Sequence, residues 1–374
     1  MTKYYLDIHA LQTVPPSNVN RDDTGSPKTA VYGGARRARV SSQAWKRAIR
    51  KDFKDYLDAS ELGIRTKRLV ELVAGHVREL SPDLADRAGE LAVSALEAGG
   101  FKVEVSKSKG TEDAKPPQTG YLLFVSNVQA RKLAELAVAA DREGAKLEKK
   151  AVKEALNTDH SVDVALFGRM IADSTDLNVD ASTQVAHAIS VHAVETEFDY
   201  FTAVDDENAA DESGAGMIGT VEFNSSTLYR YATVNLQGLV ANLGDKDASV
   251  KAAASFVRSF IESMPTGKQN TFANRTLPDA VVVTLRERTP LNLVGAFEEA
   301  VDGESGKGRL KGAAERLARY AVDMEQGYGP GAVKTFVVAP TSAVEPLRAL
   351  GDPVTLDGLI KALEAELPER IQVA

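Results

Sequence analysis

The sequence contains no cysteine among its 374 residues. Without cysteine no disulfide can form, and this composition is typical of a reducing compartment, so we expect a cytoplasmic protein. Long apolar runs are also missing, and no stretch approaches the length of a membrane span. We expect no signal peptide at the N-terminus either, because Asp7 interrupts its short apolar run. A membrane protein and a disulfide-stabilised secreted protein are therefore both disfavoured.

Acidic residues are missing from one segment, residues 36–51, which contains seven Lys or Arg and no Asp or Glu. The whole chain has a formal net charge of −8, so the residues outside this segment sum to −15. A locally basic segment in an acidic protein indicates an anionic partner at one place on the surface. The overall acidity argues against a nonspecific coat for nucleic acid.

The spacing of residues after Ser41 and Ser42, two favourable N-cap residues, predicts a helix. Apolar residues return at helical spacing, at Trp45, Ile49, Phe53 and Tyr56. Polar and basic residues lie beside this stripe, at Gln43, Lys46, Arg47, Arg50 and Lys54. The first turn of a helix offers free backbone N–H groups and a positive dipole end, so we predict phosphate binding there. An ordinary capped amphipathic helix with a solvated charged face is the alternative.

The N-terminal segment, residues 4–13, alternates in polarity and predicts a half-buried strand. His9 on this strand is either a packed, hydrogen-bonded residue, which we favour, or a base that faces RNA. Residues 14–34 are rich in proline and glycine and predict a long loop. Asp22 and Asp23 in this loop could bind a metal ion or act as a base, but a capped turn is favoured because no third ligand is evident.

The remaining chain alternates between helical and strand-like segments. Residues 59–180 predict a mostly helical insertion, although residues 162–171 resemble a strand. His187 and His192 are five residues apart, a spacing that does not suit a shared metal ion. Lys268 lies in a polar loop that is a second, weaker candidate for anion contact. Strands on both sides of a helical insertion indicate an α+β fold.

A second unusual segment, residues 195–224, holds nine acidic residues and no Lys or Arg. It also contains several glycines and the aromatic pair Tyr200 and Phe201. This composition predicts a protruding hairpin that avoids phosphates and contacts a basic protein surface. A solvated loop without fixed structure is the alternative.

Several of these segments, taken together, resemble the CasC family, the backbone subunit of the type I-E CRISPR Cascade complex. The motifs that carry the resemblance are long and in order: Asn20-Arg21-Asp22-Asp23, Val31-Tyr32-Gly33-Gly34, Arg36-Arg37-Ala38-Arg39-Val40-Ser41-Ser42-Gln43, Lys46-Arg47-Ala48, Asp199-Tyr200-Phe201-Thr202-Ala203-Val204-Asp205-Asp206 and Tyr229-Arg230-Tyr231-Ala232. The resemblance as a whole extends from the first strand to about Phe272. The helical insertion and the C-terminal hundred residues match less distinctly.

The resemblance implies a modified RRM-like (ferredoxin-like) palm with a helical fingers insertion and a thumb hairpin. The palm would comprise residues 1–58, 182–193 and 226–374. The fingers would comprise residues 59–181, and the thumb residues 194–225.

The resemblance also implies the site residues and the partners. Contacts to the guide would come from Arg21, Lys28, Ser41, Gln43, Lys46, Arg50, Met170 and Lys268. Contacts between subunits would come from Tyr200, Phe201 and Thr202 of the thumb, where Tyr200 replaces an expected tryptophan. The partners would be CRISPR RNA, target DNA paired with it, further copies stacked head to tail and other Cascade subunits. No catalysis, metal ion or cofactor is implied.

Two other functions are compatible with the sequence. Backbone subunits of type III complexes cut target RNA with a loop aspartate, so Asp22 or Asp23 could serve a ribonuclease, or His9 could serve one that needs no metal. A general RNA-binding module outside CRISPR systems would not need a self-associating thumb.

Overall fold

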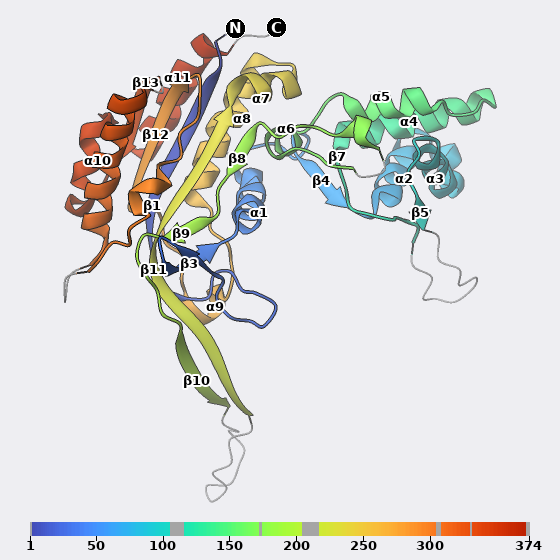
Figure 1. Ribbon diagram of the computed structural model, residues 1–374. Coiled ribbons are helices and arrows are strands. Elements are labelled where there is room, and N and C mark those ends of the chain that lie inside the picture. Colours follow the sequence, from blue (N-terminus) through green and yellow to red (C-terminus); the bar gives the residue numbers. More distant parts are fainter. Residues whose placement is uncertain are drawn as a thin grey trace, which may run out of the picture. The chain divides into compact units, whose positions relative to one another are not determined.

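The computed structural model describes residues 2–104, 116–171, 174–203, 217–303, 308–329 and 331–371 (Figure 1). The chain divides into two compact units, which are described separately. Unit 1 comprises Met1–Asp52, Thr183–Leu236 and Ala253–Ile371, and unit 2 comprises Phe53–Ser182, Gln237–Ala252 and Gln372–Ala374. Both strands and helices contribute to the fold, so the predicted α+β class is confirmed.

Unit 1 is built on a ten-stranded sheet with the order β14-β13-β12-β1-β11-β9-β3-β2, and β8 and β10 also pair with β11. Its strands are β1 (Tyr4–Ser17), β2 (Thr29–Tyr32), β3 (Ala35–Val40), β8 (Thr183–Val185), β9 (Ala188–Ser190), β10 (Glu197–Ala203), β11 (Met217–Asn235), β12 (Ala280–Glu287), β13 (Ala332–Val338) and β14 (Asp352–Pro353). Strand β1 pairs antiparallel with both β11 and β12, which makes it an interior strand.

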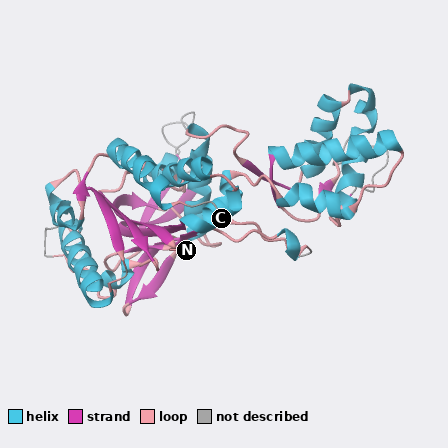
Figure 2. Ribbon diagram, turned by 90° about the horizontal axis from the view of Figure 1, so that it is seen from above, coloured by secondary structure: helices cyan, strands magenta, loops and turns pink. Residues whose placement is uncertain are grey.

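The prediction that the first strand is half-buried is wrong. Its polar residues Asp7, His9 and Gln12 are each at most 1% exposed, because helices cover both faces of the sheet (Figure 2). The favoured interpretation of His9 is confirmed, since its Nδ1 lies 2.9 Å from the Tyr229 hydroxyl. Burial lowers the pKa of His9 to about 3, so the ring is neutral at pH 7.

Helices pack on the sheet of unit 1 from both sides. They are α1 (Ser42–Asp52), α8 (Lys246–Glu262, from Ala253 onward in this unit), α9 (Gln269–Phe272), η4 (Leu293–Phe297), α10 (Leu310–Tyr328), η5 (Ser342–Leu350) and α11 (Leu356–Arg370). On one face, Phe297 and Leu317 join Tyr229, Tyr231 and Val337 in a single apolar core. Since neighbouring side chains of a strand point to opposite faces, Arg230 points to the other face.

The loop predicted over residues 14–34 is shorter than expected. Strand β1 continues to Ser17, and β2 and β3 form a hairpin whose turn is Gly33-Gly34. Both glycines have positive φ angles, 56° and 74°, which suit the twist of a two-residue hairpin. A Cβ atom on Gly33 would also lie 1.6 Å from the Glu298 carbonyl oxygen, so only glycine fits there.

Unit 2 is mostly helical. Its elements are η1 (Phe53–Asp55), β4 (Gly63–Thr66), α2 (Leu69–Leu80), η2 (Pro82–Arg87), α3 (Ala88–Ala98), β5 (Val103–Glu104), β6 (Gln118–Thr119), β7 (Leu123–Ser126), α4 (Asn127–Glu143), α5 (Lys149–Asn157), α6 (Val162–Phe167), η3 (Thr175–Leu177) and α7 (Leu236–Leu243, from Gln237 onward in this unit). The strand-like segment at residues 162–171 contains helix α6 instead, because a short apolar run fits a buried helix as well as a strand. Across the described ranges, no helix combines the length and the apolar character that a membrane span requires.

Candidate nucleic-acid interface

Helix α1 begins directly after β3, and its start has the geometry expected of an N-cap. The Ser41 hydroxyl oxygen lies 3.3 Å from the backbone N–H of Ala44, from which it accepts a hydrogen bond. Trp45 and Ile49 are buried at 1% and 0% exposure, while Gln43 and Arg47 are exposed. The helix therefore buries its apolar stripe and presents its polar and basic stripe to the surface, as predicted.

A buried arginine packs beneath the first turn of α1. Arg230 of β11 is 1% exposed, and its guanidinium carbon lies 3.7 Å from the Trp45 ring centroid and 4.4 Å from that of Phe260. Its Nη1 donates a hydrogen bond of 2.6 Å to Gln12 Oε1. Burial lowers its pKa to about 9, which still leaves the group charged at pH 7. Cation–π contacts on both sides hold the helix start against the sheet.

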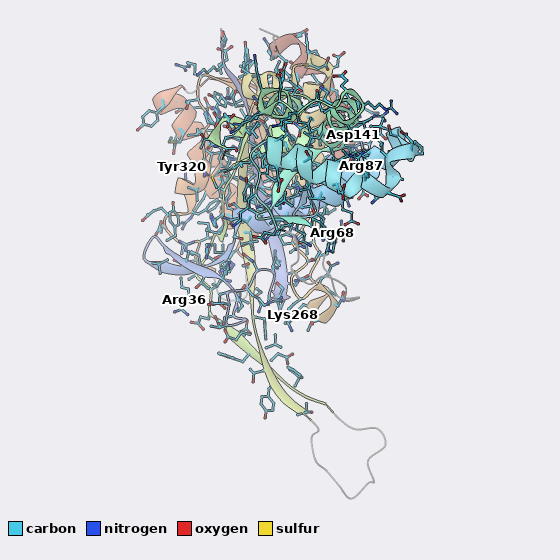
Figure 3. The ribbon with its side chains drawn as sticks, turned by 90° about the vertical axis from the view of Figure 1, so that its right-hand side faces the viewer. Arg36, Arg68, Arg87, Asp141, Lys268 and Tyr320 are labelled. Atoms are coloured by element: carbon cyan, nitrogen blue, oxygen red, sulfur yellow. The ribbon has the colours of Figure 1, made fainter. Side chains whose placement is uncertain are left out.

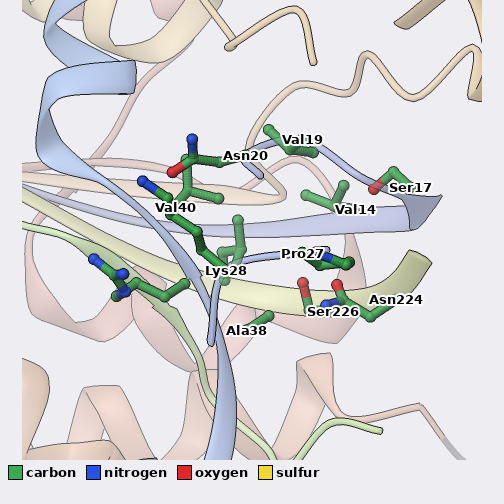
Figure 4. A pocket seen from close by; sticks show the side chains of 12 residues that line it. Val14, Ser17, Val19, Asn20, Pro27, Lys28, Ala38, Val40, Asn224 and Ser226 are labelled. Atoms are coloured by element: carbon green, nitrogen blue, oxygen red, sulfur yellow. The ribbon is translucent and has the colours of Figure 1, made fainter. Parts of the chain in front are cut away.

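The loop between β1 and β2 is hydrogen-bonded to the start of α1. Asn20 Oδ1 accepts a 2.8 Å hydrogen bond from the Ser41 N–H, and the Asn20 carbonyl accepts one of 2.8 Å from the Lys28 N–H. The Lys28 carbonyl in turn accepts a 2.9 Å bond from Arg39 N–H. These contacts surround a small pocket of about 20 Å³ to which Asn20, Lys28 and Arg39 contribute (Figure 4). Sequence reasoning missed the role of Asn20, since its partner lies 21 residues away.

The loop that carries Lys268 reaches the same region of unit 1. Its neighbour Gly267 lies so close to the first loop that a Cβ atom would be 2.0 Å from the Val19 carbonyl oxygen. Lys268 is partly exposed and precedes α9 with a positive φ of 48°. Figure 3 shows Lys268 and Arg36 at the end of unit 1 from which the hairpin of β10 and β11 extends.

The structure thus gathers most of the predicted RNA contacts in unit 1. Arg21 and Gln43 are exposed, and Ser41 is 7% exposed. Three further basic residues are partly exposed, namely Lys28, Lys46 and Arg50. Partial burial lowers the pKa of Lys46 below its ordinary value. The predicted contact Met170 belongs to unit 2, where it is 84% exposed.

One of the seven basic residues in segment 36–51 is not available to a ligand. Arg37 is fully buried, and its guanidinium donates hydrogen bonds to backbone carbonyls rather than to solvent. The acceptors are the carbonyl oxygens of Tyr32, Ser190, Phe297 and Glu298. Its charge supports the packing of the β2–β3 hairpin, so the basic segment serves structure as well as surface potential.

The segment predicted to form the thumb contains an antiparallel pair of strands, β10 and the first part of β11. Tyr200 and Phe201 are 65% and 39% exposed, and Thr202 is also exposed. Phe201 lies opposite Gly219, where a Cβ atom would be 2.4 Å from the Phe201 ring. The acidic residues at positions 205–207, 211 and 212 lie outside the described residues.

The candidate catalytic and metal-binding groups have other partners. Asp22 Oδ1 accepts hydrogen bonds from the Thr24 hydroxyl at 2.7 Å and from the N–H groups of Thr24 and Ser26 at 3.0 Å. These bonds, the Thr24 hydroxyl first, lower the pKa of Asp22, as in a capped turn. His192 Nε2 accepts from the Thr227 N–H. Within the described ranges, no group of three metal-ligating side chains occurs.

Comparison with known proteins adds four findings. A family model described as CT1975-like protein matches residues 6–362. One solved structure, described as a CRISPR RNA-guided surveillance complex, pre-nicking, is similar with a TM-score of 0.83 and 36% identity over 96% of this chain and 99% of that chain. A second, described as a CRISPR RNA-guided surveillance complex, has a TM-score of 0.71 and 31% identity over the same shares. No curated protein sequence matches.

Proposed function

The chain belongs to the CT1975-like protein family, which confirms the resemblance to CasC backbone subunits, and from that premise we propose that it is the RNA-binding scaffold of a type I-E surveillance complex. Several copies stack head to tail along one CRISPR RNA, and other Cascade subunits bind the ends of the stack. The scaffold orders the guide for pairing with target DNA, and it performs no catalysis.

The observation that carries this proposal is the capped start of α1. The first turn offers backbone N–H groups and the positive end of the helix dipole beside Ser41, and the exposed Gln43 and the partly exposed Lys46 and Arg50 lie on one stripe that starts there. Such contacts bind the sugar–phosphate chain irrespective of its sequence, and base pairing supplies the specificity. The loop that carries Lys28 adjoins this surface through Asn20, and the loop that carries Lys268 packs against it at Val19.

Unpaired surface cations support the same assignment. Elsewhere, basic side chains commonly face carboxylates, as in Arg87–Asp141 (labelled in Figure 3) and Lys251–Glu61. Within the described ranges, no carboxylate lies within salt-bridge distance of Arg21 or Lys28. Basic groups without a salt-bridge partner, in a chain of net charge −8, favour a local positive potential that attracts phosphate.

A double charge reversal tests the proposal. In Lys46→Glu with Arg50→Glu, repulsion of phosphate should reduce co-purified guide RNA at least about tenfold, since each reversal costs on the order of 1 kcal/mol or more. Lys311→Glu with Arg319→Glu, on exposed positions of α10, changes the charge equally and is the matched control. Normal RNA content in the α1 variant, with an unchanged circular dichroism spectrum, would refute the proposal.

The ribonuclease alternative receives little support from the residues that it requires. Buried His9 is neutral and hydrogen-bonded to Tyr229, and Asp22 is held in its turn. Incubation of assembled complex with matching RNA and magnesium tests this point. We expect intact RNA, and cleavage that is lost in Asp22→Ala or Asp23→Ala would overturn the scaffold-only proposal.

The division into palm, fingers and thumb is part of the proposal. The RRM-like palm is assigned to residues 1–58, 182–193 and 226–374, the fingers to residues 59–181 and the thumb to residues 194–225. The mostly helical content of unit 2 and the exposed aromatic side chains of β10 are consistent with these roles.

A further inference from the structure

We propose that Arg39 and His187 form, together with Lys28, a second phosphate-binding subsite beside the start of α1. The inference rests on the proposed function, and it names two residues to which neither the motifs nor the comparisons give a role. The ligand is a phosphodiester group of the same RNA that binds α1.

The first observation is the contact between the two side chains. Arg39 Nη1 lies 3.2 Å from His187 Nδ1, and Arg39 Nε donates a hydrogen bond of 3.3 Å to the Thr29 carbonyl. A guanidinium can only donate, so Nδ1 of His187 must be the acceptor in this contact. The neutral ring then carries its proton on Nε2. Partial burial, followed by the charges of Arg39 and Lys28, lowers the pKa of His187, which favours this neutral form at pH 7.

The second observation is that Arg39 and Lys28 lie at the same pocket. Arg39 and Lys28 both line the pocket in Figure 4, whose other lining residues include Asn20 and no acidic residue. Asn20 joins this pocket to α1 through its 2.8 Å hydrogen bond to the Ser41 N–H. A strand that passes the start of α1 can therefore continue directly over the pocket.

The third observation is that the groups left available for a ligand are all donors. Arg39 and Lys28 are partly exposed and His187 is exposed, and no carboxylate in the described part of the chain lies within salt-bridge distance of either cation. Two cations and an imidazole N–H form a donor set that matches phosphate oxygens. Ordinary surface packing gives no reason to place two uncompensated cations beside a histidine whose free nitrogen donates.

Measurements of RNA affinity at several salt concentrations test the subsite with the full-length chain and a fluorescent single-stranded RNA. Arg39→Gln should weaken binding about threefold to tenfold and should reduce the slope of log affinity against log salt by about 0.7, the value of one phosphate contact in a single strand. Arg39→Lys keeps the charge and should keep the slope. Lys311→Gln on α10 should change neither quantity.

His187 is tested with a pair of variants. His187→Ala removes the donor and should weaken RNA binding a few-fold, whereas His187→Gln can still accept from Arg39 and donate outward and should retain more of the affinity. If Arg39→Gln leaves both affinity and slope unchanged while Lys46→Glu with Arg50→Glu abolishes binding, the second subsite is refuted and the proposed function stands. If wild-type protein binds no RNA, the proposed function itself fails.

Discussion

Single buried polar residues on the central strands of unit 1 carry charge that the fold has to accommodate. Asp7 is fully buried and pairs with Arg286 Nε at 3.0 Å, and it also accepts a 3.0 Å hydrogen bond from the Tyr231 hydroxyl. Arg230 instead has two aromatic rings as neighbours. His9 lies on β1 between Asp7 and Ala10, the residue that pairs with Arg230, and its ring is neutral. Among these residues, His9 makes stability depend on pH.

Stability should fall as pH falls below about 6.5, because of His9. The pKa of His9 is about 3 in the folded protein and 6.5 ordinarily, so only the unfolded chain takes up this proton over that interval. At pH 5 the loss is ~2 kcal/mol, at about 1.4 kcal/mol for each pH unit. Urea unfolding of His9→Phe, which retains an aromatic ring, should show a weaker decline between pH 6.5 and 5. An identical decline in both proteins would contradict this assignment.

At the scale of elements, three segments separated in sequence meet in unit 1. They are the loop between β1 and β2, the start of α1 and the loop before α9. The Asn20 side chain joins the first two by accepting a hydrogen bond from the Ser41 N–H, and the close approach of Gly267 to Val19 joins the third. Phosphate contacts can be shared among them only while this packing holds.

The substitution Gly267→Ala tests this junction. Its Cβ atom would lie 2.0 Å from the Val19 carbonyl oxygen and 2.8 Å from that of Asn18, so the loops must separate. Strain of this kind costs about 1–3 kcal/mol, and we expect both a lower urea midpoint and weaker RNA binding. Gly244→Ala is not a suitable control because of its positive φ, whereas Gly75→Ala on α2 is, because nothing lies within 4 Å of its added Cβ. If Gly267→Ala were as stable as the wild-type protein, the loop before α9 and the loop between β1 and β2 would not be held together at this contact.

The aromatic pair on β10 gives a prediction about assembly. Replacing Tyr200 and Phe201 with Ala should impair the stacking of subunits more than the capture of RNA by one subunit, since the two aromatic side chains are 65% and 39% exposed. Light scattering with RNA present measures the assembly size. Val322→Ala with Tyr328→Ala on α10 removes exposed apolar surface elsewhere and should leave that size unchanged. Full-length assemblies from the β10 variant would exclude this role.

Elements that depend on local sequence patterns could be predicted, whereas features that depend on long-range contacts could not. Helix α1 follows from the cap at Ser41 and the spacing of Trp45 and Ile49, which need no information from elsewhere. The burial of Arg37 and the contact of Asn20 with Ser41 depend on segments far away in sequence, so the sequence pattern could not show them. The alternation of polar residues in β1 predicted a half-buried strand. These polar side chains are instead buried, because they pair with buried cations and hydroxyl groups.

At the scale of the whole molecule, an acidic chain contains one segment, residues 36–51, with seven basic residues and no acidic one. Its net charge of −8 disfavours nonspecific binding to nucleic acid, while the proposed RNA surface around α1 and the neighbouring loops would attract phosphate. A head-to-tail contact that does not close into a ring makes an open stack, whose length the RNA and the end subunits determine. In the proposed assembly, RNA binding and subunit stacking would be coupled, because each copy would bind the strand that its neighbour also contacts.

The most direct measurement is an experimentally determined structure of this chain assembled with its RNA. We expect phosphate oxygens within hydrogen-bonding distance of Ser41 or Gln43 and within salt-bridge distance of Lys46 or Arg50, in every copy. An RNA strand that passes elsewhere, with those four side chains surrounded by solvent, would contradict the account.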